Sequence, residues 1–159
     1  MEPETYDLKL ESVVDAPRDE VFHAWTTPEC LAHWYRPFDD WCIPVSEVNL
    51  TIGGAYRFGF GSPEGKTFYE VGEFREIRPP ERLAYTCRFE GAFKEQPEET
   101  LVTVEFEDIG HKTRVRVTHQ GYLDAEDRDA HQRGWPNFLE QLRQFLDARR
   151  LPPGPARSA

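Results

Sequence analysis

The sequence predicts an α+β fold in which a seven-stranded antiparallel sheet curls around one long C-terminal helix. From about residue 41 to residue 121, apolar and polar residues alternate between turn residues, which is typical of antiparallel strands. The segment from about 124 to 149 instead spaces its apolar residues three and four apart and should form an amphipathic helix. Because this helix must bury its apolar face, and only the sheet offers enough apolar surface, the sheet should wrap around it.

The N-terminal part of the chain predicts one strand followed by two short helices. Residues 5–14 place apolar side chains on one face and charged side chains on the other. Pro17 then opens a helical pattern, because proline is tolerated in the first turn of a helix. Thr27-Pro28 repeats this start signal, and the second helix should end before Pro37.

Six further strands should follow, separated by glycine- and proline-containing turns. We expect them at residues 41–49, 55–60, 66–77, 83–89, 102–106 and 115–119. In the C-terminal helix, Gly134 and Pro136 interrupt the pattern, so either the helix starts afresh near Trp135 or a longer helix kinks there. Residues 1–150 should form a single domain, and the proline-rich residues 151–159 a disordered tail.

The chain is acidic, with 29 Asp and Glu against 19 Lys and Arg and a net charge of -10. This balance disfavours nucleic acids and anionic membrane surfaces as partners. The acidic N-terminus does not resemble a secretory signal, and no apolar stretch is long enough to insert into a membrane. Three cysteines without a paired spacing predict reduced thiols, and the histidines show no metal-binding spacing. We therefore expect a cytoplasmic protein without a metal or other cofactor.

The order of several short motifs resembles the START-like, or SRPBCC, superfamily, which shares the helix-grip fold of the birch pollen allergen. The closest resemblance is to the branch named after the C-terminal domain of the activator of heat-shock-protein-90 ATPase. The matching positions are residues 14–26 (VDAPRDEVFHAWT), Trp34, Gly53-Gly54, Gly72-Glu73-Phe74, residues 79–83 (PPERL), residues 113–115 (TRV), Thr118-His119, Gly121, Gly134-Trp135 and Leu142. They extend from about residue 8 to residue 148.

This resemblance implies a helix-grip fold and, in many members, a cavity between the sheet and the long helix. The superfamily includes lipid carriers, plant ligand binders and aromatic polyketide cyclases, so it does not imply one activity. The activator that names the branch has two domains, and this chain has room for one. A chaperone role is therefore poorly supported by the resemblance.

An apolar cavity that binds a small hydrophobic or amphipathic molecule, such as a lipid, is the function we expect. The chain is rich in large rings, with 11 Phe, 4 Trp and 6 Tyr. The candidate lining residues, with Trp34 and Trp41 near the mouth, are Trp34, Trp41, Phe58, Phe60, Tyr85, Cys87, Phe89, His119, Trp135, Phe138 and Leu142. The alternative is that these rings fill the core completely.

Few polar residues are expected at the inner face of the sheet. His119 alternates with buried valines and should point inward, either to orient a ligand or as a core histidine bonded to its neighbours. Tyr85 could offer its hydroxyl to the cavity. The pattern around Glu70 leaves its orientation open, because two adjacent residues compete for the inner face. Cys87 should be buried and unreactive.

Two other functions remain open from the sequence. The first is a cyclase-like or hydrolase-like enzyme, in which His119, with Tyr85 or Glu70, transfers protons in the same cavity. It requires two ionisable groups that converge on the cavity. The second is a protein-interaction module like the chaperone activator, which requires an exposed apolar or charged patch. A homodimer is also possible.

Overall fold

The computed structural model describes residues 5–90 and 96–150, with side chains described for 5–90 and 99–149. The elements are β1 (Tyr6–Val14), α1 (Arg18–Thr26), α2 (Pro28–Trp34), β2 (Cys42–Val48), β3 (Ala55–Gly61), β4 (Thr67–Arg78), β5 (Arg82–Glu90), β6 (Gln96–Asp108), β7 (Thr113–Tyr122) and α3 (Ala125–Arg150). The predicted tail lies outside the described residues.

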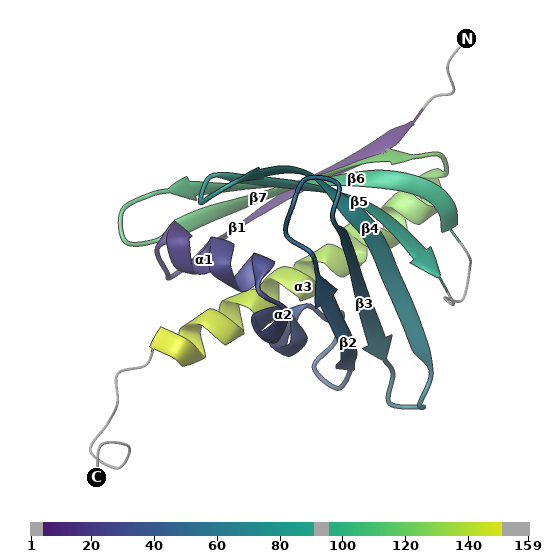
Figure 1. Ribbon diagram of the computed structural model, residues 1–159, viewed down its shortest axis with the longest axis horizontal. Helices are drawn as coiled ribbons and strands as arrows, with labels where there is room; N and C mark the ends of the chain where they lie inside the picture. The colour runs from purple at the N-terminus through teal and green to yellow at the C-terminus, as the bar shows by residue number, and fades with distance from the viewer. Residues whose placement is uncertain (1–4, 91–95, 151–159) are drawn as a thin grey trace.

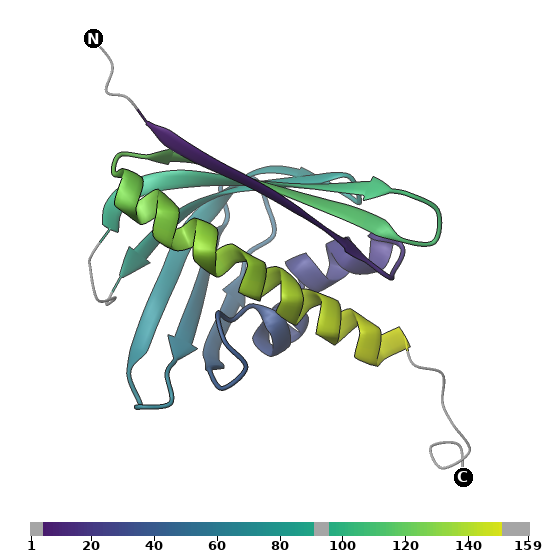
Figure 2. The ribbon, with the colours of Figure 1, turned by 180° about the vertical axis from the view of Figure 1, so that it is seen from behind.

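The strands form one antiparallel sheet of seven strands in the order β1-β7-β6-β5-β4-β3-β2. The sheet bends strongly, so that β2, β3 and β4 run at a steep angle to β1, β6 and β7, and α3 occupies the trough between these two groups (Figure 1). Seen from behind, α3 crosses the whole concave face, and α1 and α2 pack beside its C-terminal half (Figure 2). The predicted α+β helix-grip fold is confirmed.

The long helix is continuous. Residues Ala125–Arg150 form one helix of 26 residues that contains Pro136, so the alternative of a fresh start near Trp135 is wrong. Its buried side chains, Trp135, Leu139, Leu142 and Leu146, follow one another at helical spacing on the face toward the sheet. Pro136 lacks the backbone N–H that would bond to the preceding turn, which weakens the helix next to its largest buried ring. No helix among the described residues is long and apolar enough to cross a membrane.

The strand between residues 96 and 108 is longer than the pattern predicted. β6 begins at Gln96, six residues before the expected start at Val102. Residues 96–101 show no apolar alternation in the sequence, but their backbone pairs with β5, and Leu101 also pairs with β7. Its inner-face positions nevertheless include Thr100, which is buried. Backbone pairing, and not side-chain polarity, sets the length of this strand.

Trp34 occupies the core and not the mouth of a cavity, which corrects our expectation. Its side chain is fully buried, and its Nε1 donates a hydrogen bond to the Ala24 carbonyl oxygen at 2.9 Å. The ring packs edge-on against Trp25, with 4.9 Å between ring centroids. Trp34 therefore fixes α2 against α1.

Gly72 allows one aromatic side chain to cross β4. Tyr56 of β3 lies opposite Gly72, where a Cβ atom would lie 2.8 Å from the Tyr56 ring and 2.0 Å from the carbonyl oxygen of Thr86. Neither approach is possible for a residue with a side chain. The missing side chain lets Tyr56 extend across the inner face toward β5.

We predict that Gly72→Ala lowers the free energy of unfolding by roughly 1–3 kcal/mol, because the new methyl group overpacks a site bounded by backbone. Urea denaturation measures this difference. Gly134→Ala is the matched control: nothing lies within 4 Å of its Cβ position, and alanine favours the helix, so its stability should equal or exceed that of the unmodified protein. Equal stabilities for Gly72→Ala and the unmodified protein would contradict the prediction.

Candidate functional site

Rings fill most of the space between the sheet and α3. One internal cavity, of about 10 Å³, lies among these rings. It is lined by Trp25, Leu31, Tyr56, Phe58, Phe74 and Tyr85. A cavity of this size has room for at most one water molecule. In the structure as it stands, a ligand larger than water would have to displace side chains.

The candidate lining residues differ in burial and position. Those that are buried are Trp34, Phe58, Phe60, Tyr85, Cys87, His119, Trp135 and Leu142, and those that are half-buried are Trp41, Phe89 and Phe138. The structure brings Phe58, Phe60 and Phe138 together around Tyr35, with ring centroids 4.9 to 6.2 Å from that of Tyr35. Phe89 lies apart from them, against His131.

A buried carboxyl group lies at the centre of the inner face. Glu70 of β4 is 3% exposed and points inward, in phase with buried Phe68 and Phe74, which settles its orientation. Its Oε2 atom accepts hydrogen bonds from the hydroxyls of Tyr56 at 2.9 Å and Tyr35 at 3.1 Å. Two other parts of the chain, the residue after α2 and strand β3, therefore donate to one carboxyl group on β4.

The hydroxyl of Tyr56 has two acceptors for its one hydrogen. It lies 2.6 Å from the backbone carbonyl oxygen of Thr86 and 2.9 Å from Oε2 of Glu70. Tyr56 therefore shares its single hydrogen between these two acceptors.

A chain of donors reaches Glu70 from the other side. Trp25 Nε1 donates to the hydroxyl of Tyr85 at 3.2 Å, and the hydroxyls of Tyr85 and Tyr35 are 3.1 Å apart. Because Tyr35 donates to Glu70, Tyr85 must donate to Tyr35. Every hydrogen of these hydroxyl groups is then used inside the protein.

Burial sets the ionisation of this cluster. Loss of hydration raises the pKa of Glu70 from 4.5 to about 7, although its hydrogen bonds from Tyr56 and Tyr35 favour the carboxylate. Burial also raises the pKa values of Tyr35, Tyr56 and Tyr85 well above 10. Near neutral pH, Glu70 is therefore the group of this cluster that gains or loses a proton.

His119 is bonded on both ring nitrogens. Its Nδ1 accepts a hydrogen bond from Trp135 Nε1 at 3.0 Å, which places the ring hydrogen on Nε2, 2.7 Å from Thr100 Oγ1. The hydroxyl of Tyr122 lies 2.7 Å from Nδ1 of both His119 and His131. The expected inward orientation is observed, and these contacts fit a core histidine that joins α3 to the sheet.

The two imidazoles stack, with 5.9 Å between ring centroids. His131 thus packs against the core from α3. Burial lowers the pKa of His119 well below 6.5 and that of His131 to about 4, so both are neutral near pH 7. Within the described part of the chain, no three His, Cys, Asp or Glu residues gather to hold a metal ion.

A row of rings connects Tyr35 with a surface groove. Phe38 is 51% exposed and contacts Trp41, which stacks on Phe68 with 5.7 Å between centroids. Phe68 pairs across the sheet with Phe60, which stacks on Tyr35. The groove has a volume of about 560 Å³ and is lined by Phe38, Asp40, Trp41, Ser62, Pro63, Glu64, Lys66 and Phe68. Trp41 therefore lies in a surface groove.

The segment between α2 and β2, which carries Tyr35, Phe38 and Trp41, is tied to α3. Arg36 Nε donates to Gln141 Oε1 at 3.1 Å, and its Nη1 donates to the Trp41 carbonyl oxygen at 3.0 Å. Gln141 Nε2 donates in turn to Asp39. These bonds hold the segment across the end of the aromatic row.

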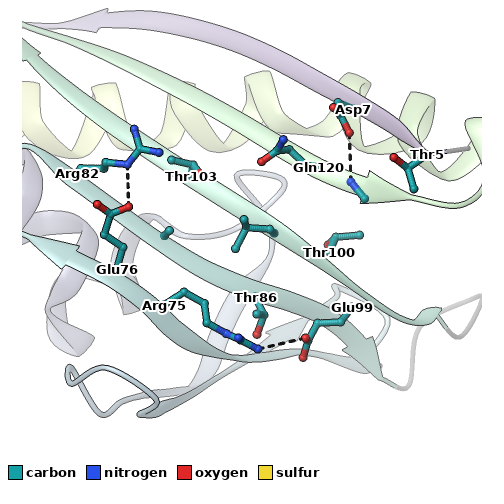
Figure 3. A pocket seen from close by; sticks show the side chains of 13 residues that line it. Thr5, Asp7, Arg75, Glu76, Arg82, Thr86, Glu99, Thr100, Thr103 and Gln120 are labelled. Carbon is teal, nitrogen blue, oxygen red and sulfur yellow. Dashed lines mark hydrogen bonds and ion pairs between the residues drawn. The ribbon is translucent and has the colours of Figure 1, made fainter. Parts of the chain in front are cut away.

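The opposite face of the sheet has a hollow of about 710 Å³ that is polar in character. Figure 3 shows it on the side of the sheet away from α3, with Arg82 paired to Glu76 and Arg75 to Glu99. Because these opposite charges already pair with each other at the surface, they attract a charged ligand only weakly. The buried Glu70 cluster is the stronger candidate site.

Glu70 and Tyr85 were candidates from the sequence, but their partners Tyr35 and Tyr56 were not. Tyr56 alternates with Phe58 and Phe60, so a buried hydroxyl that needed a partner could have been inferred there. Tyr35 has no such signal, because it follows α2 in an irregular segment.

Comparisons with known proteins agree with this fold. Residues 15–147 match the family described as Activator of Hsp90 ATPase homolog 1-like protein. A protein from Chromobacterium violaceum is 27% identical, with a TM-score of 0.77 over 87% of this chain and 95% of that one. The AHSA1 protein from Silicibacter pomeroyi is 21% identical, with a TM-score of 0.80 over 91% of this chain and 99% of that one.

An AHSA1-like protein from Aeromonas hydrophila is also similar, at 23% identity and a TM-score of 0.77, over 90% of this chain and 93% of its own. No curated protein matches the chain significantly. The family match covers most of the sequence and all helices and strands from α1 to β7, and it includes most of α3. The chain belongs to the family of Activator of Hsp90 ATPase homolog 1-like proteins.

Proposed function

We propose that the protein binds a small amphipathic molecule between the inner face of the sheet and α3, with Glu70 as its polar anchor. The observation that carries this proposal is the buried carboxyl group that receives hydroxyls from two different elements inside an aromatic interior. An apolar ligand body would contact Phe58, Phe60 and Phe138, and the ligand's polar end would face Glu70. Small-molecule sites commonly combine apolar walls with a few convergent polar groups.

Burying the ionisable side chain of Glu70 costs folding free energy that a purely structural role does not require. An apolar side chain of similar size would fill the same volume without an ionisable group, and replacing buried polar networks by apolar residues is often neutral or stabilising. The raised pKa of Glu70 means that its ionisation near neutral pH opposes folding. Groups perturbed in this way cluster at functional sites.

Access to the site would come through the aromatic row that ends at the groove beside Trp41. Phe138 of α3 is half-buried, and its ring contacts the rings of Tyr35 and Phe60. Movement of this ring, together with the segment that carries Tyr35, would create volume next to Glu70. We propose binding and not catalysis, because burial raises the pKa values of Tyr35 and Tyr56, so within this cluster Glu70 has no second group beside it that transfers a proton near neutral pH.

We predict that Glu70→Gln removes a pH dependence of stability. The pKa of Glu70 rises from 4.5 to about 7 on folding, so its neutral form stabilises the fold below pH 4.5, and this contribution is lost as the pH rises through 7. Glutamine keeps the shape, donates to Tyr56 and does not titrate. Relative to the unmodified protein, the variant should gain about 3 kcal/mol between pH 4.5 and pH 8. Urea denaturation across this range measures the gain, and parallel stability profiles would contradict it.

We predict that the uncharged fluorescent probe N-phenyl-1-naphthylamine binds the protein and that Phe138→Ala raises its affinity about threefold or more, because the lost ring leaves apolar space. Fluorescence titration measures both. Gln144→Ala, on the exposed side of α3, is the matched control and should not change the affinity. If neither protein binds the probe, binding in the interior is wrong and the protein-interaction alternative gains support.

We predict that Arg36→Ala accelerates probe association several-fold, because it removes the bonds of Arg36 to Gln141 and to the Trp41 carbonyl oxygen. Stopped-flow fluorescence measures this rate. Arg133→Ala, on the same helix as Gln141 but exposed, provides the control. Unchanged rates in Arg36→Ala would show that access does not depend on the segment between α2 and β2.

A further inference from the structure

We infer that the ligand is a protonated amine with an aromatic or apolar body, whose ammonium group pairs with the carboxylate of Glu70. This inference rests on the proposed function and specifies the chemical class of its ligand. It follows from three features of the site: the hydrogen atoms already in use, the ring faces around the carboxyl group and the sign of the nearby charges.

The O–H and N–H groups around Glu70 are already used in hydrogen bonds, which favours a ligand that itself donates hydrogen bonds. Trp25 donates to Tyr85, Tyr85 to Tyr35 and Tyr35 to Glu70, while Tyr56 is 2.6 Å from the Thr86 carbonyl oxygen. A ligand that only accepts hydrogen bonds would have to break one of these bonds. A ligand with N–H groups finds carboxyl oxygens and no competing donor to displace, because a carboxylate accepts several hydrogen bonds.

The surroundings of Glu70 suit a cation. The rings of Tyr35, Tyr56, Phe58 and Phe60 form a continuous group with centroid separations of 4.9 to 6.2 Å, and an ammonium group is attracted to such ring faces. Among the described residues, no Lys or Arg side chain pairs with Glu70. An anionic ligand would find no counterion there, whereas a cation finds a carboxylate.

The groove that leads to the site also favours a cation over an anion. The groove at the outer end of the aromatic row carries the carboxylates of Asp40 and Glu64 against one cation, Lys66. The whole chain has a net charge of -10, which attracts cations from solution. Both features raise the local concentration of an amine before it enters.

Binding releases one proton when the free protein holds Glu70 neutral. The carboxyl proton leaves to solvent, the ammonium N–H groups donate to the carboxylate, and the hydroxyls of Tyr35 and Tyr56 remain as donors to Oε2. The other titratable groups that face this site are Tyr85 and Cys87, whose raised pKa values keep them neutral. His119 of β7 lies beyond Cys87 and Thr100 and is neutral as well, and α3 presents apolar rings.

The test compares three compounds of one shape, 2-phenylethylamine, 2-phenylethanol and phenylacetate, by isothermal titration calorimetry with the full chain. At pH 7.5 we expect the amine to bind at least about tenfold more tightly than the alcohol, and phenylacetate to bind most weakly. Amine affinity should rise about tenfold per pH unit between pH 5 and pH 6.5 and level off above pH 7, because Glu70 must lose its proton. The amine itself stays protonated over this range, since aliphatic amines titrate near pH 10.

Two variants assign the effect to Glu70. Glu70→Gln should abolish both the preference for the amine and the pH slope, while still binding N-phenyl-1-naphthylamine. Tyr35→Phe removes one hydrogen-bond donor to the carboxylate. This variant should bind the amine more weakly and bind the alcohol with unchanged affinity. Circular dichroism establishes that each variant is folded.

Equal affinities for amine and alcohol, or amine affinity that falls as the pH rises, would overturn the inference. If N-phenyl-1-naphthylamine still bound in that case, the proposed interior site would stand without its amine preference. If neither the probe nor any of the three compounds bound, the proposed function itself would fail. If Glu70→Gln still bound the amine more tightly than the alcohol, the ammonium group would bind away from Glu70, and the inference would also be refuted.

Discussion

Burial of the apolar face of α3 is the constraint on which the rest of the structure depends. The helix is polar except for one line of buried side chains, and only a sheet that bends around it can cover that line. The bend brings the inner faces of β3, β4 and β5 toward the same axis (Figure 1). Any polar side chain on these faces loses water and must find its partners inside the protein.

The Glu70 cluster is the result of that loss of water. Tyr35 and Tyr56 donate to a carboxyl group that would otherwise be an unpaired polar group in a ring-filled interior, and Tyr85 and Trp25 extend the hydrogen-bonded chain from Tyr35. Gly72 makes part of this possible, since a side chain there would collide with Tyr56 and with the backbone of β5. The His119 cluster contacts α3 one turn before Phe138 and also satisfies its buried polar groups internally, with neutral groups bonded to one another. The difference between the two clusters is that only Glu70 retains a charge change near neutral pH.

Membership of the family accounts for the fold and leaves the function of the interior open. Solved relatives between 21% and 27% identical have the same architecture with TM-scores of 0.77 to 0.80. A shared helix-grip architecture determines where an interior site lies, while the few polar residues on its inner face determine what that site can bind. In this chain those residues are Glu70 and its hydroxyl partners, which is why the functional proposal is built on them and not on the family name.

The sequence by itself determined the order of the elements, the curled antiparallel sheet and the buried face of the C-terminal helix, because alternation and helical spacing are local patterns that record which side of an element faces the core. It also placed His119 and Tyr85 on the inner face, where both are buried. Only the tertiary structure decided the inward orientation of Glu70, the burial of Trp34 and the meeting of Tyr35 with Tyr56. Tyr35 and Glu70 are 35 residues apart, and their hydroxyl and carboxyl groups meet because the sheet bends around α3. No local pattern contains such a contact, since it depends on how far the strands curve and on which rings fill the remaining space.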